Sequence, residues 1–353
     1  MAAGAWRRRL IPGLAILLGA VGAAAGAWQV FHVAPLEQEL RTPFRDHGGE
    51  VMFRVGAGST ARAVAERLEA SGIVASRRVF LYGVRAAGVE AGLQAGLYRF
   101  DDPLTPAEVV RRIADGVVAT LRFTLPEGLD LDQTADALAT QEVGGADRLR
   151  EAFRDPRLTR ELMGDLDPEA ETLEGYLFPS TYRIPPETSA EGVARLLAEQ
   201  FAALWTPTRR ASAAQRERSI REIATLASIV EKETGDPAER PRVASVFWNR
   251  LRIGMPLQTD PTVLYAMRRT GNQSGNIRRA DLELESPWNT YRVRGIPPGP
   301  ISSFGVAALD AVLAPEQTNF LYFVSRNDGT HVFSRSLREH NRAVRRWQPR
   351  ITR

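Results

Sequence analysis

The chain has 353 residues, of which 44% are hydrophobic and 25% charged, so it is ordinary globular material with room for two folded domains. It has no cysteine, which excludes disulfides, thiolate metal sites and cysteine nucleophiles. Its four histidines, at positions 32, 47, 331 and 340, never stand four residues apart, and no metal or cofactor is expected. The net charge of +4 comes from basic residues scattered among nearly as many acids, which indicates a solvated surface and no nucleic-acid partner.

The first feature along the chain is an apolar run, residues 10–33, which has 24 positions and no charge. Such a run is long enough to cross a bilayer of ~30 Å. Three arginines precede it and acidic residues follow it, so the positive-inside rule predicts that residues 1–9 are cytoplasmic and that everything after residue 34 lies outside the cytoplasm. A cleavable signal peptide is the alternative, because Ala23–Ala27 offers small residues for cleavage, although the run is long for one.

The next stretch, residues 34–48, carries proline and glycine without apolar periodicity and is expected to be a linker. Beyond it, residues 49–118 alternate strand and helix patterns, which predicts a compact α+β module. The expected elements are a strand at 50–55, a helix from Ser59 or Thr60 to Ser71, a helix from Ser76, a strand at 93–100 and a helix from Thr105-Pro106 to Asp115-Gly116.

A glycine-rich loop inside this module, GAGSTA (56–61), fits the G-x-G-x-x-A pattern of dinucleotide-binding proteins and stands between a strand and a helix. A dinucleotide enzyme is therefore an alternative. Against it, no acidic residue closes a second parallel strand about 20 residues further on, because a helix begins at Ser76 instead. The glycines are explained more simply as a strand–helix turn.

Residues 119–345 are predicted to form a larger α+β domain, and residues 346–353 a tail. Aromatic and turn-forming residues gather in two irregular stretches, 171–185 around Glu174 and 286–305. Asp260 before Pro261 is typical of a capped helix start. The expected regular elements are a strand within 118–131, helices at 131–141, 146–154, 157–164, 189–204, 219–236, 239–254 and from Asp260, a hairpin of strands 320–326 and 330–334 across Asn327-Asp328-Gly329, and a last helix at 335–347.

The helix predicted at residues 219–236, SIREIATLASIVEKETGD, places a carboxylate on its apolar side. At ~100° per residue, Ile220, Ile223 and Val230 share one side of this helix. Glu231 projects onto that same side, within roughly 20° of Ile220. Burial and the negative end of the helix dipole would both disfavour its ionised form, which suits a general acid. The alternative is that Glu231 reaches water or forms a structural ion pair with an arginine.

A glycosidase of the usual kind needs a second carboxylate. Glu233 falls more than ~100° away from Glu231 on the helix. Asp260 is explained better by helix capping, which leaves Glu174 as the better spare, although glutamates near turns are also common on surfaces. A single acid would suit a reaction in which the substrate supplies the nucleophile. Lytic cleavage of murein is such a reaction, because one glutamate protonates the leaving oxygen and then takes the proton of the C6 hydroxyl.

Five stretches carry further motifs: EGYLFPSTY (174–182), LASIVEKET (226–234), RVASVFWNRLRIGMPLQTDPTVLYAM (242–267), WNTYRVRGIPPGPISSFG (288–305) and LYFVSRNDGTHVFSRSLREHN (321–341). In order and spacing they resemble the endolytic murein transglycosylases of the MltG (YceG-like) family, over about residues 50–345. Two positions depart from the family pattern as we know it, Ser180 where an acid is expected and Trp288 where tyrosine is frequent.

The resemblance implies that Glu231 is the catalytic glutamate and that Gln258, Asn289 and Tyr291 line the cleft. Glu174, in its aromatic loop, is a further substrate-binding candidate. The resemblance also implies that the module is LysM-like, that the larger domain is catalytic and that the apolar run is a single membrane span.

The activity implied is cleavage of the MurNAc–GlcNAc β-1,4 bond inside nascent glycan strands, at the periplasmic face of the inner membrane. The product would carry a 1,6-anhydro-muramyl end, and strand elongation would stop there. The expected partners are peptidoglycan strands, the inner membrane and peptidoglycan synthases. The rival hypothesis is a non-catalytic scaffold that binds glycan and recruits synthases.

Overall fold

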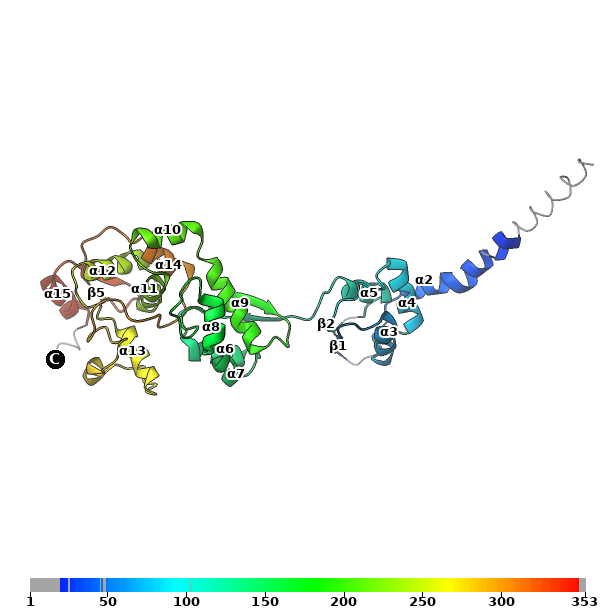
Figure 1. Cartoon of the computed structure of the whole chain (residues 1–353), viewed down its shortest axis with the longest axis horizontal. Coiled ribbons are helices and arrows are strands. Elements are labelled where there is room, and N and C mark those ends of the chain that lie inside the picture. The colour runs from blue at the N-terminus through cyan, green and yellow to red at the C-terminus, as the bar shows by residue number, and fades with distance from the viewer. Residues whose placement is uncertain (1–19, 25, 45, 47–48, 102, 349–353) are drawn as a thin grey trace, which may run out of the picture. The chain divides into compact units, whose positions relative to one another are not determined.

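The structure is a computed structural model that describes residues 20–24, 26–44, 46, 49–101 and 103–348. The chain divides into two compact units, Met1–Thr120 and Leu121–Arg353, each with its own buried apolar core (Figure 1). The predicted membrane span, residues 10–33, lies partly outside the described residues. Among the residues that are described, no helix is both long enough and apolar enough to cross a bilayer.

The smaller unit packs three helices against one pair of antiparallel strands, as the sequence predicts. Strand β1 (Val51–Val55) pairs with β2 (Gly96–Phe100) in antiparallel register, and Val51 stands opposite Phe100. Each helix is capped by a hydroxyl side chain that accepts a hydrogen bond from a backbone N–H of the first turn. The capping residues are Thr60, Ser76 and Thr105. The helices are α3 (Ala61–Ala70), α4 (Arg77–Ala87) and α5 (Pro106–Ala114).

The glycine-rich loop of this unit makes a turn between β1 and α3. Gly58 adopts φ +73°, a left-handed conformation that favours glycine. The sheet described in this unit has two antiparallel strands, whereas a dinucleotide-binding fold needs parallel strands joined through a helix. The dinucleotide alternative is therefore wrong.

The stretch expected to be a linker is structured where it is described. A π-helical turn, η1 (Gln29–Val33), leads into helix α2 (Ala34–Leu40). Leu40 lies so close to α4 that a Cβ on Gly83 would be 2.6 Å from its Cδ1. Phe44 N donates to the Leu104 carbonyl oxygen at 3.0 Å. The expectation of an irregular linker was wrong for residues 34–44, because this segment packs against the small unit.

The larger unit is mainly helical and carries two short antiparallel strand pairs. Leu121 of β3 stands opposite Ile184 of β4, and Tyr322 of β5 opposite Ser334 of β6. The elements are β3 (Leu121–Thr124), α6 (Leu131–Thr140), α7 (Ala146–Phe153), α8 (Pro156–Met163), β4 (Thr181–Ile184), α9 (Ala190–Ala203), α10 (Pro207–Gln215), α11 (Ile220–Glu233), α12 (Arg240–Arg252), α13 (Asp260–Arg269), the 3-10 helix η2 (Arg279–Glu283), α14 (Val306–Leu313), β5 (Tyr322–Ser325), β6 (His331–Ser334) and α15 (Leu337–Trp347).

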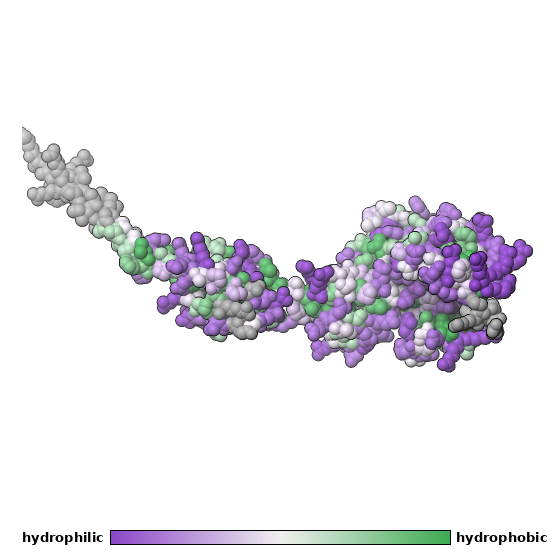
Figure 2. Space-filling view, turned by 180° about the vertical axis from the view of Figure 1, so that it is seen from behind, coloured by the Kyte–Doolittle hydropathy of each residue, from purple (hydrophilic) through white to green (hydrophobic). Residues whose placement is uncertain are grey.

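The predicted α+β class is confirmed for both units, and most predicted elements are present. Besides α2, the elements β4, α10, η2 and α14 were not expected from the sequence. The face of the larger unit shown in Figure 2 is dominated by hydrophilic residues, so the apolar side chains of these helices serve mainly to build the interior.

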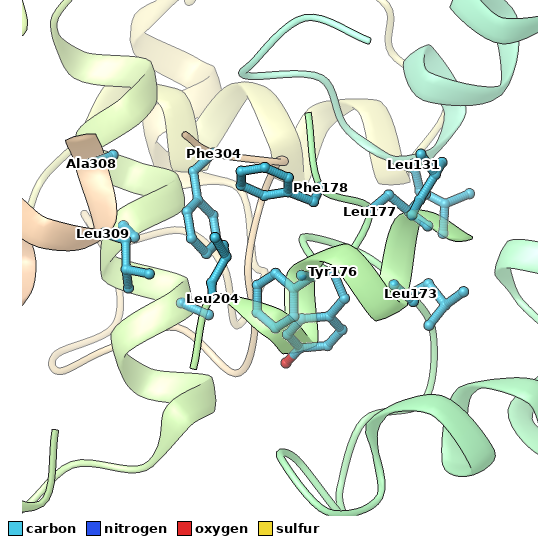
Figure 3. Close-up of a cluster of buried hydrophobic side chains, with 14 of the residues drawn as sticks. Leu131, Leu173, Tyr176, Leu177, Phe178, Leu204, Phe304, Ala308 and Leu309 are labelled. Carbon is cyan, nitrogen blue, oxygen red and sulfur yellow. The ribbon is translucent and has the colours of Figure 1, made fainter. Parts of the chain in front are cut away.

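Helix α11 runs through the core of the larger unit, where every residue from Ile223 to Val230 is buried. It packs against α12 and α14. The aromatic ring of Phe304, just before α14, is buried among Tyr176, Leu204 and Leu309 (Figure 3). Burial of an aromatic side chain of this size stabilises the fold by about 2–3 kcal/mol. Hydrogen bonds from Ile301 and Ser302 to Ser228 hold the loop before α14 against α11, and that loop carries part of the candidate site.

Candidate active site

Glu231 lies in the last turn of α11, and its side chain is buried. The helix begins with a capping box between Ser219 and Glu222, and it ends where Thr234 adopts an extended conformation. Only 5% of the Glu231 side chain is exposed. The expected burial of this carboxyl on the apolar side of the helix is confirmed.

The two carboxylate oxygens of Glu231 have partners from two other elements. Oε1 accepts a hydrogen bond from Nη2 of Arg240 at 2.5 Å, and Oε2 accepts one from the backbone N–H of Gly305 at 3.0 Å. Arg240 is the first residue of α12, and 7% of its side chain is exposed. Gly305 is the N-cap of α14, so its N–H belongs to the positive end of that helix dipole. The expected alternative, an ion pair with an arginine, is therefore also present.

Opposing influences act on the pKa of Glu231. Burial raises it most strongly, and the neighbouring Glu127 carboxyl raises it further. The Gly305 N–H and the Arg240 charge lower it. The net direction of the pKa is upward from the ordinary value of a glutamate. Glu231 therefore keeps its proton to a higher pH than an exposed glutamate does, while its two donors are already placed to stabilise the anion.

Glu127 is the third charged group at this site, and it was not predicted from the sequence. Its Oε2 lies 3.5 Å from Nη2 of Arg240, and its side chain is 46% exposed. Glu127 stands between Pro126 and Gly128, where the sequence pattern indicates only a turn. Arg240 was missed as well, because nothing local distinguishes it from its neighbours in a chain so rich in arginine. Contact between segments more than 100 residues apart assembles this group.

The loop that carries Glu127 is held by backbone bonds to the loop before α14. The N–H of Gly128 donates to the Ser303 carbonyl oxygen at 3.1 Å. The N–H of Ser303 donates to the Leu129 carbonyl oxygen at 2.7 Å. Lys232, the only lysine of the chain, donates from Nζ to the Gly128 carbonyl oxygen at 2.8 Å. The ammonium of Lys232 thus ties α11 to the Glu127 loop.

The structure brings Gln258, Asn289 and Tyr291 together. The N–H of Gln258 donates to the Thr290 carbonyl oxygen at 3.1 Å, and Gln258 adopts φ +50°, which is unusual for a residue other than glycine. Asn289 is fully buried, and its amide nitrogen donates to the carbonyl oxygens of Leu282 and Leu284. Its oxygen accepts from the N–H of Tyr291. Asn289 therefore shapes the loop from within, whereas the exposed Gln258 side chain faces solvent.

Asp260 and Glu233 form a second acidic site beside these residues. Tyr291 donates from its hydroxyl to Oδ1 of Asp260 at 2.7 Å. The N-cap of α13 is Thr259, and Asp260 is the first helical residue, so the interpretation of Asp260 as the cap was wrong. Burial and the nearby Asp260 raise the pKa of Glu233 to about 8. Glu233 points away from Glu231 as expected, but it faces another enclosed environment.

Glu174 has its own set of partners. Its carboxyl accepts hydrogen bonds from the N–H of Leu131 and the hydroxyl of Tyr265, and burial, helped by Asp130, raises its pKa to about 8. It lines a cavity of about 360 Å³ together with Tyr265 and Trp288, and Glu231 is not among the residues of that lining. Of the five predicted site residues, Gln258, Asn289 and Tyr291 are joined by hydrogen bonds within one region, and Glu231 and Glu174 each have other partners.

The Glu231 carboxyl can hold and release one proton. In the part of the chain that the structure describes, no group of three or more histidine or acidic side chains is arranged to hold a metal ion. A family model described as the YceG-like family matches residues 53–346.

The chain belongs to the YceG-like family. An endolytic murein transglycosylase of Bacillus subtilis (strain 168) is 32% identical over 326 residues, which are 89% of this chain and 87% of that protein. One from Streptococcus pneumoniae serotype 2 is 29% identical over 83% of this chain, and the match spans 58% of its length. The crystal structure of a yceG-like protein, lmo1499, from Listeria monocytogenes aligns with a TM-score of 0.57 at 32% identity, covering 83% of this chain and 98% of that one.

The two unusual positions of this YceG-like chain both have structural contacts. The carbonyl oxygen of Ser180 accepts from the N–H of Leu125 at 2.9 Å, next to the β3–β4 pair. The indole N–H of Trp288 donates to the Gly299 carbonyl oxygen at 3.3 Å, and the Arg269 guanidinium lies 4.4 Å from the centre of a Trp288 ring. Neither position contacts Glu231 through a hydrogen bond, so neither departure disturbs the proposed acid.

Proposed function

We propose that this YceG-like protein is an endolytic murein transglycosylase that cleaves the MurNAc–GlcNAc β-1,4 bond within glycan strands and uses Glu231 as acid and then as base. The proposal is supported by relatives of that name, matched over most of the chain. One observation carries the role of Glu231. Its side chain is 5% exposed, the pKa of its carboxyl is raised, and the carboxyl accepts one hydrogen bond from Arg240 and one from a helix N-terminus.

The reaction requires one proton to leave the carboxyl and one to return. In the first step Glu231 gives its proton to the oxygen that links C1 of the muramyl residue to the next sugar, and the C1–oxygen bond breaks. In the second step the C6 hydroxyl oxygen of the same muramyl residue bonds to C1, and its proton passes to Glu231. The carboxyl ends as it began, no water is consumed, and the product carries a 1,6-anhydro ring.

Each contact of Glu231 has a place in this cycle. Burial keeps the proton on the carboxyl before the substrate arrives. Once the proton has left, the Arg240 guanidinium and the Gly305 N–H stabilise the carboxylate, and neither has to move because both already contact it. A preorganised acceptor of this kind lowers the cost of the charge that develops on the acid.

The apolar run at residues 10–33 would hold the protein in the inner membrane with its larger unit on the periplasmic side. The smaller unit would serve as the LysM-like module, and synthases that elongate glycan strands would be partners. The charge pattern around the run and the motif resemblance support these assignments. Protease treatment of spheroplasts should digest the larger unit, and its survival would contradict this orientation.

A second candidate function is a non-catalytic scaffold that binds peptidoglycan. The Arg240–Glu231 ion pair favours it, because a buried pair of this kind can also be purely structural. The two functions differ in whether new chain ends appear.

Mass spectrometry of purified sacculi after digestion would separate them. The wild type should release fragments with 1,6-anhydro-muramyl ends, and the Glu231→Gln variant should release at least ~100-fold fewer. Equal release by both proteins would remove Glu231 from the mechanism. Binding to sacculi without any new ends would favour the scaffold.

A further inference from the structure

The three charged groups in direct contact at this site, Glu231, Arg240 and Glu127, do not balance if all of them are ionised. The Nη2 atom of Arg240 lies 2.5 Å from Glu231 and 3.5 Å from Glu127, whereas the Lys232 ammonium is more distant and donates to the Gly128 carbonyl oxygen. Two carboxylates facing one guanidinium leave a net negative charge in a largely buried place. Like-charged carboxyls that share a site avoid this by keeping one proton between them.

We propose that Glu127 and Glu231 form a single-proton carboxyl pair bridged by Arg240, in which Glu127 stays ionised and thereby holds the proton on Glu231. This inference rests on the proposed function and adds a positioning residue to it, since Glu127 acts through Glu231.

Exposure decides which member of the pair carries the proton. The Glu127 side chain is 46% exposed, so water stabilises its charge, whereas only 5% of the Glu231 side chain is exposed. The ionised form therefore costs less free energy on Glu127 than on Glu231. The Glu127 carboxylate then repels a negative charge on Glu231, and its influence on the pKa of Glu231 is upward.

The fold supports this arrangement at a second point, because Gly305 leaves room for the Glu127 carboxyl. A Cβ at position 305 would stand 1.8 Å from Oε1 and 2.4 Å from Cδ of Glu127. The backbone of Gly305 has φ −84° and ψ 171°, a conformation open to any residue. The absence of a side chain there therefore serves the contact with Glu127 and is not needed for a turn.

The groups that face Glu231 come from four elements. They are Arg240 on α12, Glu127 on the loop after β3, the Gly305 N–H at the start of α14 and, on α11 itself, the more distant ammonium of Lys232. The Nε atom of Arg240 is buried and has no hydrogen-bond partner among the described residues. The Nη2 atom of this guanidinium is the one that contacts both carboxyls.

The charge count gives the pair a purpose in the reaction. Before the reaction the three groups in direct contact are one neutral carboxyl, one carboxylate and one guanidinium, and their net charge is zero; the more distant Lys232 ammonium is not counted. After Glu231 has given its proton to the leaving oxygen, these three groups carry one net negative charge while the sugar carries one positive charge. The pair therefore opposes loss of the proton to water and favours its transfer to a substrate that becomes positive.

The pH dependence of kcat/KM for the full-length protein tests the pair. In Glu127→Gln the repulsion is lost and Arg240 is left to Glu231 alone, so the pKa of Glu231 should fall. The alkaline limb of the profile should move to lower pH by about one unit. Glu127→Asp should keep most of the wild-type limb, and Glu199→Gln, which changes an exposed carboxyl on α9, should leave it unmoved. An alkaline limb that stays in place in Glu127→Gln would overturn the pair.

A titration that needs no activity makes this test independent of the proposed function. The carboxyl carbon of Glu231 can be followed by 13C NMR in labelled protein, with Glu231→Gln used to assign the signal. The apparent pKa should be lower in Glu127→Gln than in the wild type, and equal values would overturn the pair. If the pKa is lower in Glu127→Gln but the wild type forms no anhydro ends, the proposed carboxyl pair is supported and the proposed transglycosylase activity is rejected.

Discussion

Gly305 and Glu127 contact each other so closely that a methyl group on Gly305 would overlap the Glu127 carboxyl, at 1.8 Å from Oε1. The two residues belong to loops that lie far apart in the sequence, and the backbone bonds between Ser303 and residues 128–129 hold these loops together. Gly305 also donates its N–H to Glu231. Gly305 therefore contacts both the buried Glu231 and the neighbouring Glu127 carboxyl.

Gly305→Ala should consequently displace Glu127 without changing any charge. We expect the alkaline limb of kcat/KM to move to lower pH, in the same direction as in Glu127→Gln, and the rate to fall by about tenfold. The matched control is Gly145→Ala, because Gly145 is also a helix N-cap with φ −85°, and a Cβ there meets nothing within 4 Å. If both alanine variants keep the wild-type profile, the close contact at position 305 has no consequence for catalysis.

The two glutamates at the end of α11 should respond differently to substitution. Glu231→Gln removes the proton that the reaction uses, so release of anhydro-muropeptides should fall by at least ~100-fold. Glu233 has a pKa of about 8 and is largely protonated at neutral pH, so glutamine resembles its resting form. Glu233→Gln should therefore keep most of the activity at pH 7. The reverse order of the two activities would assign the acid to Glu233.

The helix that carries Glu231 could be predicted from the sequence because its signals are local. Apolar periodicity predicted a helix at residues 219–236, and the observed helix, Ile220–Glu233, lies within that stretch. The hairpin of β5 and β6 has the same property, since Asn327 to Gly329 mark its turn. Predictions of this kind need no knowledge of distant parts of the chain.

The partners of Glu231 could not be predicted in the same way. Arg240 and Glu127 reach it from other segments, and neither residue differs from the many arginines and glutamates around it. Strand β4 was missed for the same reason, because its partner β3 lies some 60 residues earlier. Asn289 sits in a recognised motif, yet only the structure shows that its amide is used by the backbone of its own loop.

Two enclosed carboxyls should make the folded protein less stable as pH rises. Glu174 and Glu233 each have a pKa of about 8 in the folded protein, against 4.5 for an ordinary glutamate. The folded state binds more protons than the unfolded state between these values. The stabilisation is therefore complete below about pH 4.5 and is lost progressively up to about pH 8. Each group should contribute on the order of 1 kcal/mol per pH unit.

Urea unfolding at a series of pH values checks this sign. The free energy of unfolding of Glu174→Gln or Glu233→Gln should fall less steeply between about pH 5 and pH 8 than that of the wild type. Glu199→Gln provides the control, since Glu199 is exposed on α9. A wild type and a Glu174→Gln variant with parallel profiles would show that Glu174 titrates normally.

Arg240→Met should shift the activity profile in the direction opposite to Glu127→Gln. Without the guanidinium, the ionised form of Glu231 loses its counter-charge, so its pKa should rise and the alkaline limb should move to higher pH. The rate at the optimum should still fall by about tenfold or more, because the carboxylate left after proton transfer is no longer stabilised. Stability should decrease more at high pH, where the buried carboxyl must ionise without a partner.

The matched control is Arg242→Met on the same helix, whose ion pair with Glu316 is about 40% exposed on both sides (39% and 41%) and should contribute less than about 1 kcal/mol. If Arg240→Met and Glu127→Gln move the alkaline limb in the same direction, Arg240 does not act on Glu231 through its charge.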